Sequence, residues 1–486
     1  MSPLLLFIFV MIYFSVLLVV AYYTSRNSNN ETFFIGNKNS NWMLVAFGMI
    51  GTSLSGVTFV SVPGTVGHAN FAYFQVVIGY FIGYLVIAYV LLPLYYRLNL
   101  TSIYNYLLKR FGLTTYKTGS LFFIISRTLG ATARLYLVIN VLQIFILDQM
   151  NVPFWLTTII ILGMILLYTY RGGVKTIVWT DTLQTTFMLL GLIVCVVFIM
   201  QLLHLSFGQT MSALADKGYT KIFNSNLNSP EFFIKQIVGG AFITIAMTGL
   251  DQEMMQKNIS VKTLKDSQKN MVSFSFIIVA VNFLFLLLGG LLYLYAAREN
   301  ITVTGDDLFP TIALKSLPKI VGIIFIIGLI SALFPSADGA ITALTSSFCI
   351  DILGIKRNEN MDEAQKKRVR QFVHISFAFV FMICVMVFKE INNKSIINVI
   401  LKVAAYTYGP LLGLFTFGIF TKRKVTEKLI PIVCLAAPAL CYLFEANQAL
   451  LLNNYKVGIE LLLINGILTF IGVYLISSKD SSAINL

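Results

Sequence analysis

Two segments that are apolar overall carry residues that weaken a helix and supply oxygen atoms. The first reads VAFGMIGTSLSGVTFVSVPG and spans residues 45–64. Glycine breaks a helix at low cost, and carbonyls freed in lipid persist only where they line a buried site. Such carbonyls, with the hydroxyls of Ser53, Ser55 and Thr58, form the all-oxygen ligand set that a hard cation prefers. The segment therefore predicts a broken helix with an alkali-cation site.

The second segment reads IGLISALFPSADGAITALTSSFCIDIL. Pro335 has no N–H, so the carbonyl of Ser331 loses its helical partner, and Ala332 and Ser336 lie one turn apart on one face. Asp338 is an acid deep in an otherwise uncharged span, where burial costs at least ~2.5 kcal/mol. We interpret it as functional, the alternative being an acid that pairs with a nearby base for packing.

A third set of charged residues also falls inside apolar segments. Asp181 lies in RGGVKTIVWTDTLQTTF, and Arg127 and Arg134 lie in SRTLGATARLYLV. An unpaired guanidinium in the middle of a span is expensive. Arg134 either pairs with Asp181 or Asp338 as part of the structure, or faces a cavity and binds a carboxylate with two hydrogen bonds.

Composition identifies the elements that must hold these residues. The 486-residue chain is 57% hydrophobic and 12% charged, against about 25% charged in soluble domains. Long apolar runs recur throughout, which indicates an all-α polytopic membrane protein rather than a barrel. The 5 cysteines and 3 histidines lack CxxC or metal-ligand spacing, and no Walker, GxSxG or HExxH motif indicates an enzyme.

The apolar runs predict about thirteen transmembrane helices. Their expected ranges are 3–23, 42–66, 71–97, 118–147, 153–170, 174–203, 232–250, 268–297, 319–350, 371–388, 395–420, 427–446 and 457–477. The first run is too long for the core of a signal peptide and has no basic residue before it, so we expect a retained helix.

The net charge of +14 follows from topology, with no nucleic acid as a partner. With the N-terminus outside and the C-terminus inside, four basic loops face the cytoplasm. They contain Arg97, Lys109, Arg110 and Lys117; Lys257, Lys262, Lys265 and Lys269; Lys356, Arg357, Lys366, Lys367, Arg368 and Arg370; and Lys422, Arg423, Lys424 and Lys428. We expect a multi-pass protein of the plasma membrane, or of the inner membrane in a bacterium.

The second and seventh spans are both interrupted by small residues, and five spans separate the start of one from the other. Paired interruptions in two halves are typical of secondary transporters with inverted repeats, although glycine also serves close helix packing. We expect one transporter domain over 1–486. Its parts would be a peripheral first helix at 3–23, repeats at 42–203 and 232–420, and two peripheral helices at 427–477.

Five motifs, in order along nearly the whole chain, resemble the sodium:solute symporter family. They are GTSLSGVTFVSVPG, SRTLGATARLYLV, RGGVKTIVWTDTLQ, TGLDQEMMQ and AYTYGPLLGLFTFGIFTKR. The family includes sodium-coupled symporters of glucose, proline, iodide, vitamins and sialic acid. The resemblance implies the LeuT-type fold with a 5+5 inverted repeat, an outside N-terminus, and alternating access driven by Na⁺ as the coupling ion.

The resemblance also implies a main sodium site formed by Gly51, Leu54, Ala332, Pro335 and Ser336. The first three positions would supply backbone oxygens, and the last two are hydroxyl positions in the family. Ser336 keeps its hydroxyl, whereas the proline removes one ligand. The carbonyl that this proline frees four residues earlier is a candidate replacement.

Some relatives, similar to the sialic-acid symporters, hold a second Na⁺ with an acid that matches Asp181 and with hydroxyls at positions that are Asp338 and Gly339 here. Asp181 and Asp338 therefore form a candidate second cation site with altered chemistry. A proton on Asp338 is the alternative.

The sequence says less about the residues that bind the solute. Sugar-binding positions read Thr58, Val77, Thr244 and Ile278 here, so most sugar-type hydrogen-bonding groups are absent, and the gating tyrosine falls on Met247. Arg134 matches the arginine that holds the carboxylate in sialic-acid symporters. Candidate solute contacts are Ser55, Thr58, Phe74, Gln75, Arg134, Thr244, Thr248 and Tyr406.

These observations predict a Na⁺-coupled symporter in the lipid bilayer that imports a small organic solute. The solute is expected to bear a carboxylate, as sialic acid, monocarboxylates and some vitamins do. The sequence predicts no obligate protein partner. Alternatives are a symporter of a neutral sugar, amino acid or iodide on the same fold, or a Na⁺-conducting, channel-like protein.

Overall fold

The computed structural model describes residues 3–25, 33, 40–100, 102–355, 357, 360–391, 396–452 and 455–479. The side chains of residues 171–173 and 175, which open the motif RGGVKTIVWTDTLQ, and Lys356 of the third basic loop lie outside the described part.

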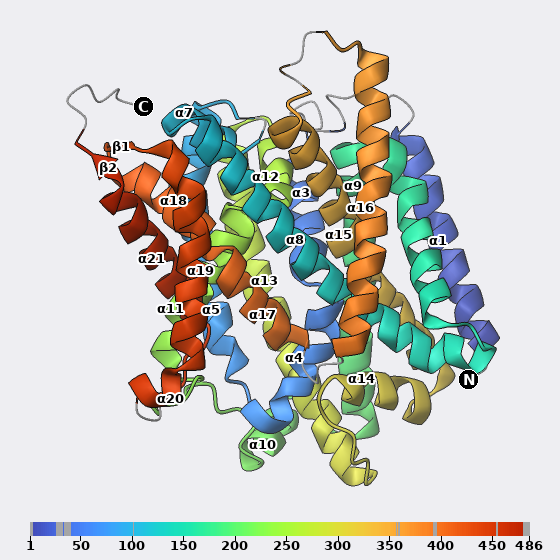
Figure 1. Ribbon diagram of the computed structural model, residues 1–486. Coiled ribbons are helices and arrows are strands. Elements are labelled where there is room, and N and C mark those ends of the chain that lie inside the picture. Colours follow the sequence, from blue (N-terminus) through green and yellow to red (C-terminus); the bar gives the residue numbers. More distant parts are fainter. Residues whose placement is uncertain are drawn as a thin grey trace.

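The first half of the chain folds into helices that run back and forth through one bundle (Figure 1). Its elements are α1 (Pro3–Ser25), α3 (Trp42–Ser53), α4 (Gly56–Ala69), α5 (Tyr73–Val86), η2 (Ile87–Leu91), α6 (Leu92–Arg97), α7 (Asn105–Arg110), α8 (Leu113–Leu142), η3 (Gln143–Leu147), η4 (Asp148–Met150), α9 (Phe154–Leu202) and α10 (Phe207–Asp216).

The second half adds further helices and one short antiparallel strand pair. Its elements are α11 (Phe233–Thr244), η5 (Ile245–Gly249), α12 (Gln252–Ile259), α13 (Leu264–Arg298), η6 (Gly305–Asp307), α14 (Leu308–Thr311), η7 (Ile312–Ser316), α15 (Lys319–Ser347), η8 (Phe348–Ile352), α16 (Glu363–Ile391), α17 (Ile396–Thr407), α18 (Gly409–Phe420), β1 (Lys424–Val425), η9 (Glu427–Leu429), α19 (Ile430–Ala446), α20 (Gln448–Leu451), α21 (Leu461–Leu475) and β2 (Ser477–Ser478).

Helices dominate because a chain in lipid must satisfy its own backbone hydrogen bonds. Eight described helices are long and apolar enough to cross a membrane, and the number rises to eleven if each of three bent pairs is one span. Two shorter apolar helices, Phe154–Tyr170 within α9 and Leu461–Leu475, match the fifth and thirteenth expected ranges. The prediction of an all-α polytopic protein is confirmed, while the count of thirteen crossings stays a prediction.

Three spans are broken rather than straight. The axis bends by 57° between α3 and α4, by 65° between Phe233–Gly249 and α12, and by 45° between Ile397–Thr407 and α18. The first two breaks fall in the second and seventh expected spans, where the small residues interrupt the apolar runs. The bent helices that the sequence predicts are therefore present.

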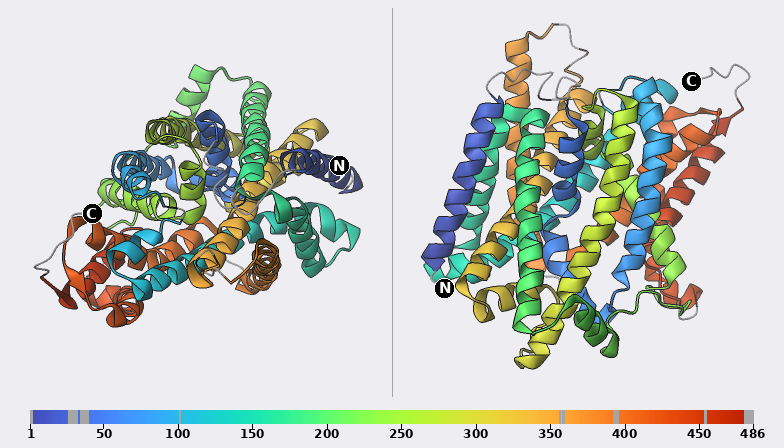
Figure 2. Two further views of the ribbon diagram at one scale, coloured as in Figure 1. Left: turned by 90° about the horizontal axis from the view of Figure 1, so that it is seen from above. Right: turned by 180° about the vertical axis from the view of Figure 1, so that it is seen from behind.

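Helix α15 lies at the centre of the bundle and packs against α9, α8, α3, α1 and α16. Seen from above, helices surround it on several sides (Figure 2, left). Pro335 lies inside this helix without ending it, so the ninth expected span is continuous, whereas the second, seventh and eleventh are bent at a break. The boundaries of the two repeats stay a prediction.

The basic loops lie at one end of the bundle. Figure 1 shows α7, α12 and β1 near its upper edge, and α1 begins near the lower edge. The strand pair joins Lys424 to Ser478 at the upper edge. This arrangement agrees with the expected clustering of positive charge, although the side of the membrane stays a prediction.

Helix α5 approaches α11 too closely for any side chain at Gly79. A Cβ atom there would lie 2.9 Å from Gly240 Cα and 2.8 Å from Ala241 N, both of which are backbone atoms that cannot yield. Gly163 in α9 has nothing within 4 Å of the same position.

We expect Gly79→Ala to destabilise the protein, because overpacking between helix backbones costs roughly 1–3 kcal/mol. The matched change Gly163→Ala should leave stability unchanged or raise it, since alanine favours a helix over glycine by up to about 1 kcal/mol. Thermal unfolding of both purified variants in detergent measures the difference. A Gly79→Ala protein as stable as the parent would show that α5 and α11 do not pack this closely.

Candidate functional site

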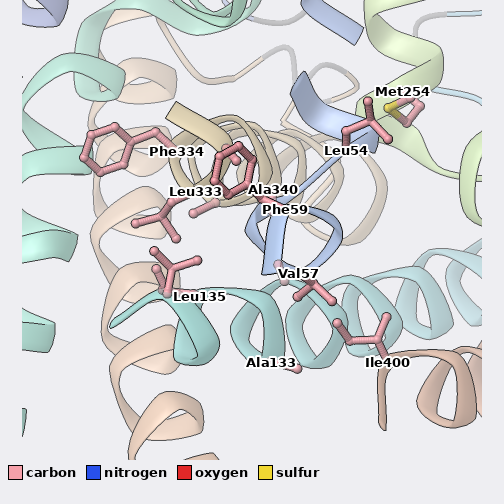
Figure 3. Close-up of a cluster of buried hydrophobic side chains, with 14 of the residues drawn as sticks. Leu54, Val57, Phe59, Ala133, Leu135, Met254, Leu333, Phe334, Ala340 and Ile400 are labelled. Carbon is pink, nitrogen blue, oxygen red and sulfur yellow. The ribbon is translucent and has the colours of Figure 1, made fainter. Parts of the chain in front are cut away.

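A cavity of about 100 Å³ surrounds the break between α3 and α4. Residues from seven regions line it: the broken segment itself, α5, α8, α11 with η5, α12, α13 and α17. The lining residues are Thr52, Ser53, Leu54, Ser55, Val57, Thr58, Tyr73, Tyr80, Tyr84, Arg127, Arg134, Ile243, Thr244, Met247, Thr248, Met254, Ile278, Asn282, Ile397, Ile400 and Leu401. Figure 3 shows Leu54 and Val57 on the two sides of the break, with Met254 and Ile400 nearby.

The break leaves backbone oxygens without partners. The N–H of Leu54 donates to the carbonyl of Ile50 at 2.7 Å and ends α3, and Ser55 is extended, with φ −73° and ψ 174°. Among the described residues, no backbone N–H donates to the carbonyl of Gly51 or Leu54. Both residues are buried, so these oxygens satisfy the condition for binding a cation inside the bundle.

Helix α15 passes directly beside this break. A Cβ atom on Gly51 would lie 3.4 Å from Cγ of Pro335, and the N–H of Gly51 donates to Thr185 Oγ1 at 3.0 Å. The hydroxyl of Ser336 donates to the carbonyl of Leu333 at 2.8 Å. Its single proton is therefore used, and the oxygen lone pairs remain free to accept a cation.

The residue types at this junction suit Na⁺. Gly51, Leu54, Ala332 and Ser336 offer only neutral oxygens, and no group of three or more His, Cys, Asp or Glu side chains placed to hold a metal occurs in the described part of the chain. Ser331, whose carbonyl loses its partner to Pro335, donates its hydroxyl to Tyr13 at 2.8 Å. The individual ligands, including a replacement by the Ser331 carbonyl, stay a prediction.

The two acids of the candidate second cation site have separate partners. Oδ2 of Asp181 accepts from Lys257 Nζ at 2.7 Å and from Thr52 Oγ1 at 3.2 Å. Asp338 accepts from the hydroxyl of Tyr168 at 2.6 Å and from the N–H of Gly339 at 2.5 Å. Among the described residues, no hydrogen-bond donor is shared by the two carboxylates.

Lys257 corrects one sequence-based expectation. Its position in a basic cluster suggested a cytoplasmic loop, but the side chain is 3% exposed and lies inside the bundle. Because α12 continues the broken span to Ile259, the lysine belongs to the helix rather than to the loop that follows. The expectation that all four lysines of this cluster face the cytoplasm is wrong for this one.

Lys257 belongs to a buried network of charges that the sequence analysis missed. It contacts Glu253 at 3.3 Å, Glu253 pairs with Arg127, and Arg127 Nε lies 3.8 Å from Asp251. Asp251 also caps α12 by accepting from two of its N–H groups. The motif DQEMMQK indicates one ion pair of this network, because Glu253 and Lys257 stand four residues apart on one helix face.

Arg134 is different from the other buried cations. It lines the cavity, and among the described side chains it has no hydrogen bond or ion pair. Asp181 and Asp338, its suggested structural partners, are instead bound to Lys257 and Tyr168. Of the two alternatives left open by the sequence, the geometry favours a guanidinium that faces the cavity.

Five of the eight candidate solute contacts line the cavity, namely Ser55, Thr58, Arg134, Thr244 and Thr248. The other three do not line it. Phe74 packs against Phe283, Gln75 holds the backbone of Glu231, and Tyr406 donates to Glu445 of α19. Neither the polarity of these three side chains nor their position in matching spans predicts whether they line the cavity, because that depends on the helix face that each occupies.

Three tyrosines of α5 were overlooked. Tyr73, Tyr80 and Tyr84 line the cavity, and Tyr84 contacts the hydroxyl of Ser53 at 3.2 Å. Their spacing of seven and four residues puts them on one helix face, a signal that was available in YFQVVIGYFIGY. Asn282 also lines the cavity, and its side-chain oxygen is buried without a partner among the described residues.

Comparison with known proteins adds independent evidence. A solved structure of a substrate-bound, outward-open Na⁺-coupled sialic acid symporter superposes with a TM-score of 0.81, 18% identity, and coverage of 98% of this chain and 99% of that one. A sodium/sialic acid symporter of Aliivibrio fischeri is 21% identical over 88% of this chain and 85% of its own length. A sodium-dependent multivitamin transporter of Oryctolagus cuniculus is 24% identical over 84% of this chain and 65% of its own length.

A family model also matches the part of the chain that forms this fold and the break beside α15. That model, described as the sodium:solute symporter family, matches residues 33–428. The matched region contains all three broken spans, α15 and every residue that lines the cavity. The chain belongs to the sodium:solute symporter family.

Proposed function

We propose that this protein is a Na⁺-coupled symporter that imports a small carboxylate-bearing solute by alternating access. One observation carries the proposal: the break at Leu54 and Ser55 is shared by the candidate ion site and the cavity. The carbonyl of Leu54 is free, and its side chain and that of Ser55 line the cavity. An ion bound at this carbonyl fixes the backbone that shapes the solute site, which couples the two binding events.

The driving force follows from the charge that Na⁺ carries. One positive charge moving through 100 mV supplies ~2.3 kcal/mol, which corresponds to about fifty-fold accumulation of a neutral cargo. A carboxylate anion cancels the charge of one Na⁺, so for such a solute the inward concentration gradient of Na⁺ supplies the driving force. We therefore infer a plasma-membrane location, or the inner membrane in a bacterium, with Na⁺ and solute crossing together.

The cavity supports a solute with one charged end and one apolar end. Arg134 offers a guanidinium without a protein partner, and hydroxyls of Ser55, Thr58 and Thr248 lie around the same space. Part of the wall is aliphatic and is formed by Ile243, Ile278, Ile397, Ile400 and Leu401, while the tyrosines of α5 and Asn282 add further polar groups. A guanidinium binds a carboxylate with two parallel hydrogen bonds, so Arg134 favours a carboxylate at the charged end of the solute.

The cavity has a volume of about 100 Å³ and is partly open, so its volume sets no upper limit on the length of the solute. Monocarboxylates and sugar acids both carry the carboxylate that Arg134 can bind. The unpartnered oxygen of Asn282 would accept a hydrogen bond from a hydroxyl or amino group, so a small hydroxy acid or amino acid is the second candidate.

We expect Ser336→Ala to weaken Na⁺ binding while the protein still folds. Losing an oxygen that contacts a charged group costs about 1.5–3 kcal/mol, so the Na⁺ concentration for half-maximal uptake should rise roughly 10- to 100-fold. Uptake into proteoliposomes at graded Na⁺ concentrations measures this value. The matched control is Ser376→Ala, because that exposed hydroxyl makes the same kind of bond to its own helix at 2.9 Å. Equal Na⁺ dependence in both variants would exclude Ser336 as a ligand.

We expect Arg134→Ala to abolish uptake of an anionic solute and to spare Na⁺ binding. Of the two arginines that line the cavity, Arg127 pairs with Glu253, whereas Arg134 has no ion pair among the described side chains. Radiolabelled pyruvate, lactate, alanine, N-acetylneuraminate and glucose form the test panel, each with and without a Na⁺ gradient. Arg298→Ala, which removes an exposed arginine, is the control. Retained uptake in the Arg134 variant would contradict its role. A solute-independent Na⁺ current would favour the channel alternative.

A further inference from the structure

The ammonium of Lys257 lies among three oxygens in a pattern that resembles the coordination of a cation. Its Nζ is 2.7 Å from Asp181 Oδ2, 2.6 Å from Thr52 Oγ1 and 3.3 Å from Glu253 Oε1. An ammonium has three N–H donors, and all three have acceptors here. The side chains of Lys257, Asp181 and Glu253 are no more than 3% exposed.

The contacts of Lys257 join the two broken spans. The lysine lies in the last turn of α12, which follows the break in the seventh span, and Thr52 lies in the last turn of α3, which precedes the break in the second. Thr52 is adjacent in sequence to Gly51, whose carbonyl belongs to the candidate sodium site. The ammonium therefore lies one residue along the chain from the candidate sodium site and contacts Asp181 of the candidate second cation site.

The charges around Lys257 leave little room for a further cation at Asp181. Three acids, Asp181, Glu253 and Asp251, surround two bases, Lys257 and Arg127. Oδ1 of Asp181 has no partner in the described part of the chain. A cation there would still share a carboxylate with the ammonium, and two like charges about 4 Å apart repel by about 4 kcal/mol at an effective dielectric constant of about 20.

Asp338 does not complete a second ion site with Asp181. Its two oxygens accept from the hydroxyl of Tyr168 and the N–H of Gly339. A Cβ atom on Gly339 would collide with the carboxylate of Glu253, so α12 with its charged residues packs against α15 at this point. Each of the two acids therefore has its own hydrogen-bond donors in the described part of the chain, and Asp338 receives none from Lys257.

We propose that the ammonium of Lys257 acts as a permanently attached cation at Asp181, so that the chain binds one Na⁺, at the junction of α3 and α15, in each transport cycle. The inference rests on the proposed Na⁺ coupling. It replaces the candidate second cation site with an internal ion pair. One Na⁺ carried with a singly charged carboxylate moves no net charge across the membrane, so the Na⁺ concentration gradient drives uptake of such a solute.

Equilibrium binding of ²²Na⁺ to the purified full-length protein in detergent tests this proposal without any knowledge of the solute. The parent protein should bind about one Na⁺, and Asp181→Asn should still bind about one. The asparagine variant should fold, because Lys257 keeps Glu253 as a partner and the two remaining acids balance the two bases. Lys257→Met removes the attached cation and should raise the number to about two.

Lys262→Met is the matched control, since Lys262 is an exposed lysine just after the same helix, and it should bind one Na⁺ like the parent. Ser336→Ala should reduce binding in the parent background and so assign the single ion to the α3–α15 junction. Two Na⁺ bound by the parent, or loss of one in Asp181→Asn, would overturn the inference but leave Na⁺ coupling intact. A folded Lys257→Met protein that still binds one Na⁺ would also overturn it. A parent that binds no Na⁺ would overturn the proposed function itself.

Discussion

An unpaired backbone carbonyl inside a bilayer is the constraint on which the rest of this molecule depends. Water is absent there, so a helix can break only where the surrounding protein or a bound ion satisfies the freed oxygen. The break at Leu54 and Ser55 meets this condition because α8, α12 and α15 enclose it (Figure 3). Glycine makes the close approach to α9 possible, since a methyl group on Gly51 would collide with the hydroxyl of Thr185, while Pro335 of α15 would lie 3.4 Å away. The ion site and the bend are therefore two consequences of one packing arrangement.

Buried charges hold the second broken span against the first. Asp251 caps α12 after the break, and Glu253 and Lys257 extend one turn further to Arg127 and Asp181. A buried ion pair adds little net stability when complete, but removing one partner costs about 3–5 kcal/mol. The network therefore fixes how the two broken spans meet more than it adds to overall stability. Arg134 lies outside the network, and its free guanidinium is the group that a carboxylate solute can neutralise.

These two features explain how an ion gradient can drive uptake through this fold. In the proposed function, the candidate sodium site and the solute cavity share the same few residues of unwound chain, so that occupancy of one site would change the shape of the other. The proposed coupling needs no long pathway through the protein, because the side chain of Leu54 lines the cavity and its carbonyl is a candidate Na⁺ ligand. If the ammonium of Lys257 takes the place of an ion at Asp181, each transport cycle requires one Na⁺. The unwound segment at Leu54 and Ser55 is then the one place where ion binding and solute binding are coupled.

The amino-acid sequence by itself determined the class of protein, the approximate helix ranges, the breaks in the second and seventh spans, and the family. Apolar run length, glycine content and motif order are local properties, and a bilayer allows few structures that satisfy them. Only the tertiary structure decided which polar residues meet. Periodicity placed Phe74, Gln75 and Tyr406 on helices but not on the face toward the cavity, whereas the α5 tyrosines reach it. Likewise Lys257 looked like a loop residue, and Asp181 like an ion ligand, until packing joined them. A helix pattern fixes a residue's own face, but its partner depends on how another helix, distant in sequence, packs against it.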